Sequence, residues 1–254
     1  MFNSNPILTQ AGYSIPSILC KRGKQLVLLC HGITSEKTEG GFYIKLSEQL
    51  SQYHYSAMSI DFRGHGESAI AFEDATISGM VEDLIQAYCY ASQAGYKISF
   101  VCSSFGASIF LLAQAKFHFQ PTRIVLLNPV TDYLTNFVIA DTAWGRRFSP
   151  QLQSPDFWLL AKHKIPNNTL RLGRTFISEL ALLEPQATIL SPGHCALVLH
   201  GDADVVISQA SAKRFVEKHD FKTVSFVSIP GAEHAFPGHQ KTICDLTCKF
   251  LCNE

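Results

Sequence analysis

A serine at the end of a short apolar segment is the first residue of this chain whose setting suggests chemistry. Ser104 follows the segment 97–102, KISFVC, and a helical pattern begins shortly after it. A serine at such a sharp strand-to-helix turn exposes its hydroxyl above the sheet, and the crowded turn requires small residues two positions before and after it. Cys102 and Gly106 occupy those positions, whereas the neighbouring Ser103 has larger residues there. The spacing therefore indicates Ser104 as a candidate nucleophile.

Two aspartates and a histidine stand in comparable positions further along the chain. Asp202 and Asp204 follow the apolar segment 195–201, and His234 follows the segment 223–231. A serine hydroxyl becomes a nucleophile when a base accepts its proton and a carboxylate orients that base. Because the carboxyl ends of parallel strands meet at one edge of a sheet, these side chains are expected to converge on the serine. The order serine, aspartate, histidine is a known triad order, and the spacing leaves both aspartates open as the acid.

Two backbone amides would complete the site. The apolar segment 25–32 ends in Gly32, which lets the backbone approach a substrate closely, so that the amide of Ile33 can point toward it. Phe105 directly follows the serine at a helix N-terminus, where its amide supplies a second donor. Two such donors stabilise the negative charge that develops on a carbonyl oxygen during acyl transfer.

Short apolar runs alternate with amphipathic ones along most of the chain, and these elements must position the candidate residues. Strand-like runs occupy residues 25–32, 56–66, 97–102, 123–129, 195–201 and 223–231, and helical patterns occupy 42–53, 80–93, 108–117 and 211–220. Strands that are apolar on both faces and alternate with helices are typical of a parallel sheet covered by helices. The expected fold class is therefore α/β, with a mostly parallel central sheet flanked by helices.

One segment interrupts this alternation. Residues 131–190 show no strand pattern and contain helix-like pieces separated by prolines. An insertion of this length between two sheet strands is typical of a cap that covers a binding site. We therefore expect a core formed by residues 1–130 and 191–254 and a helical cap formed by residues 131–190, inserted before the last strands.

The composition excludes several classes of protein. The chain has 254 residues with 21 Lys and Arg against 21 Asp and Glu, and this zero net charge argues against a nucleic-acid partner. Apolar residues make up 46 % of the chain, which is enough for a substantial core and excludes disorder. Neither a signal-peptide pattern nor a stretch long enough for a membrane anchor is present. We therefore expect a cytoplasmic protein, and the sequence leaves a homodimer open.

The chain contains eight cysteines, which without a secretion signal are expected to be free thiols. Cys244, Cys248 and Cys252 recur every four residues along a C-terminal helical segment. A zinc site needs a fourth ligand and usually has closer spacing, so packing is the expected role of this stripe and no metal is predicted.

Five motifs occur in a set order along the chain: HGIT (31–34), DFRGHGES (61–68), CSSFG (102–106), HGDADVV (200–206) and GAEH (231–234). As a set they resemble the capped serine hydrolases of the α/β-hydrolase superfamily, which include esterases, lipases and acyl-thioesterases. The resemblance implies the α/β-hydrolase fold and no cofactor. It also implies the site residues, namely Ser104 as nucleophile, His234 as base, Asp204 as its partner, and Ile33 and Phe105 as oxyanion donors.

The same resemblance bears on two single positions. The family pattern HG-x-x-D, read from His200, ends at Asp204 rather than at Asp202. Cys102 is a departure, because the family usually has glycine two residues before the nucleophile. Cysteine is small enough for the turn to form.

Polar residues beside these motifs have plainer interpretations. Lys37 and Glu39 follow the first motif and are expected to be solvated, although contact with a substrate is an alternative. The RGHG loop, residues 63–66, is expected to be a structural turn held by hydrogen bonds. Asp202 and Glu233 are expected to lie on the surface.

The resemblance predicts hydrolysis of a carboxylic ester, with a small or aromatic acyl group as the expected substrate. An acyl thioester is the first alternative, because the segment NPVTDYL (128–134) resembles acyl-thioester hydrolases of the same fold. A non-catalytic protein that binds a small acyl ligand on the same fold is an alternative of another class. The presence of all three triad residue types disfavours it.

Overall fold

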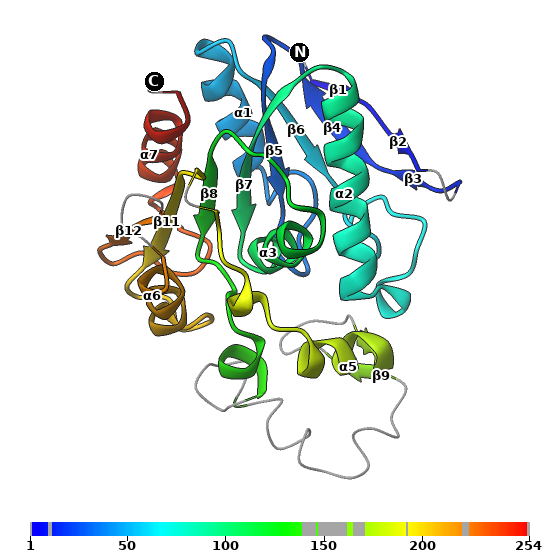
Figure 1. Ribbon diagram of the computed structural model, residues 1–254, viewed down its shortest axis with the longest axis vertical. Coiled ribbons are helices and arrows are strands. Elements are labelled where there is room, and N and C mark those ends of the chain that lie inside the picture. The colour runs from blue at the N-terminus through cyan, green and yellow to red at the C-terminus, as the bar shows by residue number, and fades with distance from the viewer. Residues whose placement is uncertain are drawn as a thin grey trace.

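The computed structural model describes residues 2–9, 12–138, 146, 162–164, 171–191, 193–219 and 224–252. Eight strands form one sheet in the order β1-β4-β6-β5-β7-β8-β11-β12 (Figure 1). Their bounds are β1 Phe2–Ser4, β4 Ser17–Cys20, β6 Ser56–Ile60, β5 Gln25–Cys30, β7 Lys97–Ser103, β8 Ile124–Leu127, β11 Ala196–Gly201 and β12 Val224–Ile229. Every neighbouring pair from β6 to β12 is parallel. Five of these six parallel strands lie within their predicted segments and β7 ends one residue beyond its segment, so the predicted α/β class is confirmed.

The sequence does not predict the strands at the N-terminal end of the chain. β1 pairs antiparallel with β4, and β4 pairs antiparallel with β6, so they extend one edge of the sheet. A separate short pair, β2 (Ile7–Leu8) and β3 (Ser14–Ile15), precedes β4. Runs of two to four residues are too short to show a strand periodicity in the sequence.

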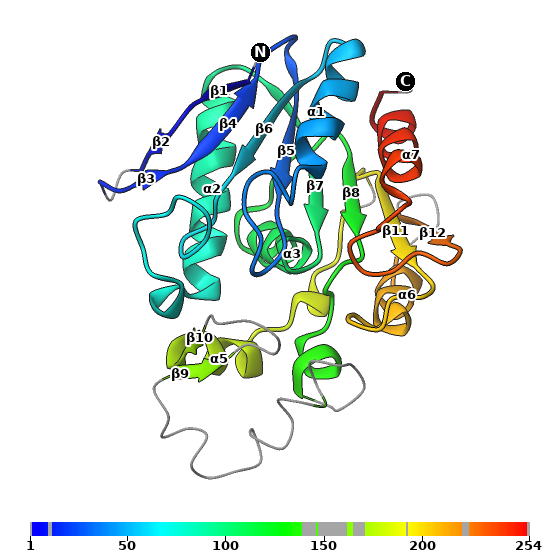
Figure 2. The ribbon, with the colours of Figure 1, turned by 180° about the vertical axis from the view of Figure 1, so that it is seen from behind.

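Helices cover both faces of the sheet (Figures 1 and 2). They are α1 (Phe42–Gln52), α2 (Ile77–Gln93), α3 (Phe105–Phe117), α6 (Gln209–Glu217) and α7 (Gln240–Cys252). Side chains of β5 alternate between two cores: Leu26 and Leu28 pack with residues of α2, α3 and α6, and Val27 and Leu29 pack with residues of α1 and α7. This alternation explains why the strand is apolar along its whole length.

The inserted segment leaves the sheet after β8 and returns at β11. Its described elements are the π-helical turn η2 (Leu134–Val138), β9 (Lys162–Lys164), β10 (Arg171–Gly173), α5 (Arg174–Leu182) and the 3-10 turn η4 (Pro185–Ala187). They lie beyond the carboxyl ends of the parallel strands (Figure 1). The antiparallel pair of β9 and β10 differs from the purely helical cap that the sequence predicts. Residues 139–145, 147–161 and 165–170 lie outside the described residues, so the boundaries 131–190 stay a prediction.

Aromatic rings attach this segment to the core. The ring of Phe105, at the start of α3, stacks on Tyr133 and on Phe176 at centroid distances of 5.5 Å each, and Phe137 packs edge-on at 6.2 Å. The first residue of the helix after Ser104 is thus held by the inserted segment.

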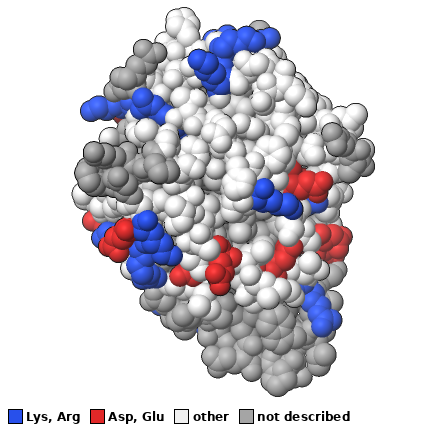
Figure 3. Space-filling model, in the orientation of Figure 1, with Lys and Arg blue, Asp and Glu red and all other residues white. Residues whose placement is uncertain are grey.

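Two further observations concern the surface. Within the described part of the chain, no helix combines the length and the apolar character needed to cross a bilayer. On the face shown in Figure 3, basic and acidic side chains form small separate groups with wide uncharged areas between them.

Candidate active site

Ser104 lies at the junction of β7 and α3 in a strained backbone conformation. Its φ is +49° and its ψ is −113°, outside the regions that residues other than glycine usually adopt. Its amide donates to the Leu127 carbonyl at 2.8 Å, and its carbonyl accepts from the Val130 amide at 3.0 Å. A β-carbon on Gly106 would lie only 2.5 Å from the Cys30 carbonyl oxygen. The sharp turn expected around Ser104 is present, and it requires the glycine two residues later.

The side chains of Ser104, His234 and Asp204 form a continuous series of hydrogen bonds. Ser104 Oγ is 2.9 Å from His234 Nε2, and His234 Nδ1 is 2.7 Å from Asp204 Oδ2. His234 lies in the loop after β12 and Asp204 in the loop after β11. When Nδ1 donates its hydrogen to the carboxylate, Nε2 can accept the serine proton. The structure therefore brings together three of the residues that the motifs imply.

The Asp204 carboxylate is shielded from solvent and surrounded by donors. Its Oδ1 accepts from the amides of Val206 and Ile207 at 2.8 and 3.0 Å, and Oδ2 also lies 3.4 Å from Nε2 of His200. Burial alone would raise the pKa of Asp204, but His200, His234 and the Ile207 amide outweigh it and hold the pKa well below its usual range. The carboxylate is therefore kept ionised opposite the imidazole.

Asn128 is a site residue that the motifs do not single out. It follows β8 with a φ of +41°, a conformation that asparagine tolerates better than most residues. Its side-chain oxygen accepts from the Gly201 amide at 2.8 Å, and its side-chain nitrogen donates to the carbonyl of His234. Asn128 thus ties together the loops that carry the acid and the base. An asparagine directly after a buried strand is the signal that would have found it.

The two candidate oxyanion donors, Ile33 and Phe105, lie near Ser104. Phe105 is the first residue of α3, where an amide has no carbonyl partner within the helix. Ile33 lines the same cavity as Ser104. A β-carbon on Gly32 would lie 3.2 Å from the Ser104 β-carbon, so the backbone before Ile33 passes very close to the serine. The structure thus places both residues beside the serine, and their role stays a prediction.

Lys37 does not lie in solvent as the sequence predicts. Its side chain is 9 % exposed, and its Nζ is 2.7 Å from Asp61 Oδ2 and 3.3 Å from Glu67 Oε2. Its amide also donates to Asp61 Oδ1 at 2.7 Å. Burial acts against the charge, but Asp61 and Glu67 raise the pKa of Lys37. The expectation was wrong because the partner carboxylate lies 24 residues away, which no local pattern reveals.

Glu39 is also expected from the sequence to be solvated, and the structure places it elsewhere. Its carboxyl lines the cavity beside Ser104, and its Oε2 accepts from the Gly32 amide at 3.0 Å. Burial raises the pKa of Glu39, and the Gly32 amide, Ser35 and His234 oppose this effect. Glu39 has a left-handed backbone conformation, with a φ of +47°. A residue expected to be solvated is therefore part of the cavity wall.

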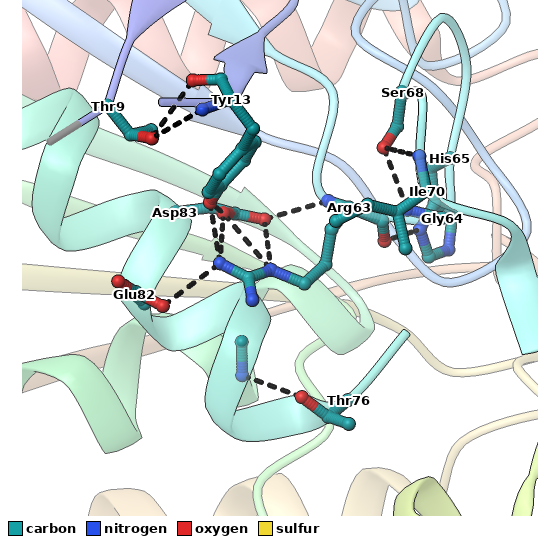
Figure 4. Close-up of polar contacts among 11 residues, drawn as sticks. Thr9, Tyr13, Arg63, Gly64, His65, Ser68, Ile70, Thr76, Glu82 and Asp83 are labelled. Atoms are coloured by element: carbon teal, nitrogen blue, oxygen red, sulfur yellow. Dashed lines mark hydrogen bonds and ion pairs between the residues drawn. The ribbon is translucent and has the colours of Figure 1, made fainter. Parts of the chain in front are cut away.

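The RGHG loop follows β6 and is held by polar contacts, as the sequence predicts (Figure 4). The Arg63 guanidinium lies between Asp83 and the Tyr13 hydroxyl, with Nη2 2.7 Å from Asp83 Oδ1, and also reaches Glu82. Burial lowers the pKa of His65 to about 3. This loop connects the N-terminal strands, α2 and the end of β6.

His31 lies between the RGHG loop and the serine. Its Nε2 accepts from the Phe62 amide at 3.1 Å, and its Nδ1 is 2.7 Å from the Gly32 carbonyl oxygen. Burial lowers the pKa of His31 to about 4. The ring is therefore neutral at neutral pH and serves as a fixed hydrogen-bonding spacer.

The remaining polar residues of the motifs lie apart from these contacts. Asp202 is exposed and its Oδ1 accepts from the Gly231 amide at 2.7 Å, and Glu233 is exposed. Cys244 and Cys248 are buried in the core formed with α1, and Cys252 is half-buried. Among the described residues, no group of His, Cys, Asp or Glu is arranged to hold a metal ion.

A cavity of about 400 Å³ opens beside the serine. Its wall combines the site residues Ser104, His234, Ile33 and Glu39 with the apolar side chains of Phe42, Leu127 and Phe236. A volume of this size suits a small organic group. The candidate nucleophile Ser104, the candidate base His234 and Ile33 thus line one space that a substrate can enter.

Comparisons with known proteins agree with this architecture. The profile of the family described as "Serine aminopeptidase, S33" matches residues 21–165. Among solved structures, Est1E from Butyrivibrio proteoclasticus with bound ferulic acid is similar with a TM-score of 0.82 and 19 % identity over 98 % of both chains. The α/β-hydrolase GrgF from Penicillium sp. sh18 is similar with a TM-score of 0.76 and 15 % identity, over 99 % of this chain and 98 % of that one.

A monoacylglycerol lipase from Paleococcus ferrophilus is similar with a TM-score of 0.68 and 14 % identity, over 94 % of this chain and 98 % of that one. No curated protein matches the sequence. At these identities the structures establish the shared fold, whereas substrate and reaction must be argued from the site.

Proposed function

Because the chain belongs to the serine aminopeptidase S33 family of α/β-hydrolases, we propose that it is a serine hydrolase that cleaves a carboxylic ester through an acyl-enzyme on Ser104. The observation that carries the proposal is the series of hydrogen bonds from Ser104 Oγ through His234 to Asp204. A serine, a base and an orienting carboxylate in this geometry can perform nucleophilic acyl transfer. No cofactor is required.

The reaction follows from the contacts. His234 Nε2 takes the hydroxyl proton as Ser104 Oγ attacks the acyl carbon, and Asp204 stabilises the imidazolium that forms. The amides of Ile33 and Phe105 receive the negative oxygen of the tetrahedral intermediate. His234 then gives its proton to the departing alcohol. A water molecule then attacks the acyl-enzyme while His234 takes its proton. His234 returns the proton to Ser104 Oγ as the acid leaves, which restores the serine.

The cavity supports a small or aromatic acyl group as the preferred substrate. Its volume of about 400 Å³ and the rings of Phe42 and Phe236 suit a compact planar group better than a long chain. The structure of Est1E was solved with ferulic acid, an aromatic acid, and that protein shares the fold along nearly the whole chain. We therefore propose hydroxycinnamoyl and short acyl esters as the first substrates to test.

The test compares wild type with Ser104→Ala on p-nitrophenyl esters of two to sixteen carbons and on methyl esters of hydroxycinnamic acids. We expect wild type to cleave short and aromatic esters and Ser104→Ala to lose at least about 10³-fold in kcat, because the covalent route is removed. Ser103→Ala is the matched control, since it makes the same change at the adjacent serine. Equal turnover by wild type and Ser104→Ala would reject the proposal.

A peptide bond is the second candidate, because the family description names a serine aminopeptidase. The two candidates differ in the leaving group, which is an amine rather than an alcohol. Aminoacyl p-nitroanilides, tested beside p-nitrophenyl esters of the same acyl group, distinguish them. An anilide cleaved as efficiently as its ester would favour the peptidase.

A further inference from the structure

The carboxyl group of Glu39 lies beside the nucleophile, and no step of the proposed reaction uses it. A β-carbon on Gly32 would lie 3.5 Å from Glu39 Oε1 and 3.2 Å from the β-carbon of Ser104, so both groups lie beside the backbone of Gly32. Glu39 Oε2 accepts from the Gly32 amide at 3.0 Å. Since Glu39 also lines the cavity with Ser104, a substrate held at the serine passes close to this carboxyl group.

Among the residues of the cavity wall that the structure describes, no lysine or arginine balances the charge of Glu39. Glu39 is also the only carboxylic acid among those described residues. Lys37 belongs to the same loop, but its Nζ contacts Asp61 and Glu67. The imidazole of His234, which also lines the cavity, pairs with Asp204.

A buried carboxylate without a cationic partner makes the cavity sensitive to the charge of its occupant. Burial raises the pKa of Glu39, which means that the ionised form lacks sufficient compensation in the free protein. A positive group entering the cavity would supply that compensation. A negative group would add a second unpaired charge beside Glu39 and beside the developing oxyanion.

We propose that Glu39 is a specificity-determining residue that favours esters carrying a positively charged group near the scissile bond and disfavours esters carrying a negatively charged one. The inference rests on the proposed ester hydrolysis at Ser104. It names the substrate class of that site as neutral to cationic.

The test measures kcat/KM for ester sets that differ in charge and hardly in shape. For the acyl side, the set is p-nitrophenyl 4-(trimethylammonio)butanoate, its neutral isostere p-nitrophenyl 5,5-dimethylhexanoate, and the anionic p-nitrophenyl hydrogen glutarate. For the alcohol side, the pair is butyrylcholine and its neutral isostere 3,3-dimethylbutyl butanoate. With both series, the charge preference of the cavity is tested whether the acyl or the alcohol part of the substrate enters it.

Glu39→Gln is the informative variant, because its amide oxygen can still accept from the Gly32 amide while the charge is removed. We expect the ratio of cationic to neutral kcat/KM to fall about tenfold in at least one series, and the anionic glutarate ester to improve. A ratio within a series cancels any general loss of activity caused by a shifted loop. Glu233→Gln is the matched control, since this exposed residue carries the same charge, follows β12 and lies outside the cavity wall.

The outcomes distinguish failure of this inference from failure of the proposed ester hydrolysis at Ser104. If Ser104→Ala abolishes hydrolysis and Glu39→Gln changes neither ratio, the inference is wrong and the proposed function stands. If Glu233→Gln shifts the ratios as much as Glu39→Gln, a general surface field explains them and the inference is also wrong.

A binding measurement decides the inference even where turnover is absent. Ser104→Ala is titrated with butyrylcholine and with 3,3-dimethylbutyl butanoate by calorimetry, beside the double variant Ser104→Ala, Glu39→Gln. Tighter binding of the cationic ester that depends on Glu39 supports the inference. If the preference for the cationic over the neutral ester is the same in both proteins, the inference is wrong.

Discussion

Asp204 and Asp83 are two buried aspartates with similar surroundings and different uses. Both side chains are fully shielded from solvent. Asp204 accepts from two backbone amides and from the ring of His234. Asp83 accepts from the Arg63 amide and the Arg63 guanidinium, and the Tyr13 hydroxyl completes its shell (Figure 4). Burial and pairing are therefore nearly the same in the two regions.

The difference lies in the partner. An imidazole takes up and releases a proton near neutral pH, whereas a guanidinium remains charged. The second ring nitrogen of His234 reaches Ser104, which faces the cavity. Arg63 Nη2, which meets Asp83, also reaches the Tyr13 hydroxyl and the exposed Glu82, and Arg63 is not among the described residues that line the cavity. A buried carboxylate therefore indicates a catalytic site when its partner can exchange a proton and lies beside a cavity.

The largest expected effect separates the two aspartates by activity. Asp204→Asn should lower kcat by about 10⁴-fold, because an amide cannot hold the imidazole in the tautomer that accepts the serine proton. The substitution preserves shape, so the melting temperature should change by only a few degrees. Ester hydrolysis and thermal unfolding of the same preparation provide the measurement. An Asp204→Asn protein that keeps a tenth of the wild-type kcat would contradict the proposed role.

The second prediction concerns stability at the other aspartate. Asp83→Asn leaves the buried Arg63 charge without its carboxylate and should destabilise the protein by about 3–5 kcal/mol, while kcat stays within a few fold of wild type. Urea unfolding and ester hydrolysis measure the two quantities. Glu82→Gln removes an exposed partner of the same arginine and should cost less than about 1 kcal/mol. Equal losses of stability in the two variants would show that burial of the pair is unimportant.

The sequence reveals the fold and the candidate triad more readily than the rest of the site. Central strands such as β5 and β7 carry apolar side chains on both faces, and this pattern is visible in the sequence alone. Ser104 is identified by the crowding of its turn, which demands small neighbours at fixed distances. Such local constraints leave a trace in the order of residues.

Constraints between distant residues leave no such trace. Lys37 and Glu39 look solvated in the sequence because Asp61, which pairs with Lys37, and Ser104, which lies beside Glu39, come from distant parts of the chain. The role of Asn128 depends on Gly201 and on the loop of His234, which lie more than 70 residues away. The short strands β1 and β4 pair at the sheet edge with residues far along the chain, and β2 pairs only with β3. A single sequence cannot show these contacts.

The third prediction concerns His31, which lies between the two regions. Its pKa is about 4 in the folded protein and about 6.5 in an unfolded chain. The unfolded chain therefore binds a proton between these values that the folded protein excludes, so stability is full above pH 6.5 and is lost as the pH falls toward 4. Going from pH 7 to pH 4.5 should cost about 2–3 kcal/mol through this residue.

The variant His31→Asn isolates that contribution, because an asparagine does not titrate and all other titratable groups are the same in both proteins. The free energy of unfolding, measured by urea at pH 7 and pH 4.5, should fall less for the variant than for wild type. If both proteins lose the same stability over this interval, the ring of His31 is not held neutral by burial.

The smallest expected effect tests whether the Asp83 region is a closed network. Tyr13→Phe removes the hydroxyl that donates to Asp83 and accepts from Arg63, and should cost about 1–2 kcal/mol of stability with no change in kcat. Tyr90→Phe is the matched control, because it removes an exposed hydroxyl that bonds only to the Asn5 side chain. Its cost should be under about 0.5 kcal/mol. Should Tyr13→Phe instead lower kcat severalfold, the polar contacts beneath the site would couple to the serine through the loop of His31 and Phe62, and the division between a structural and a chemical aspartate would have to be abandoned.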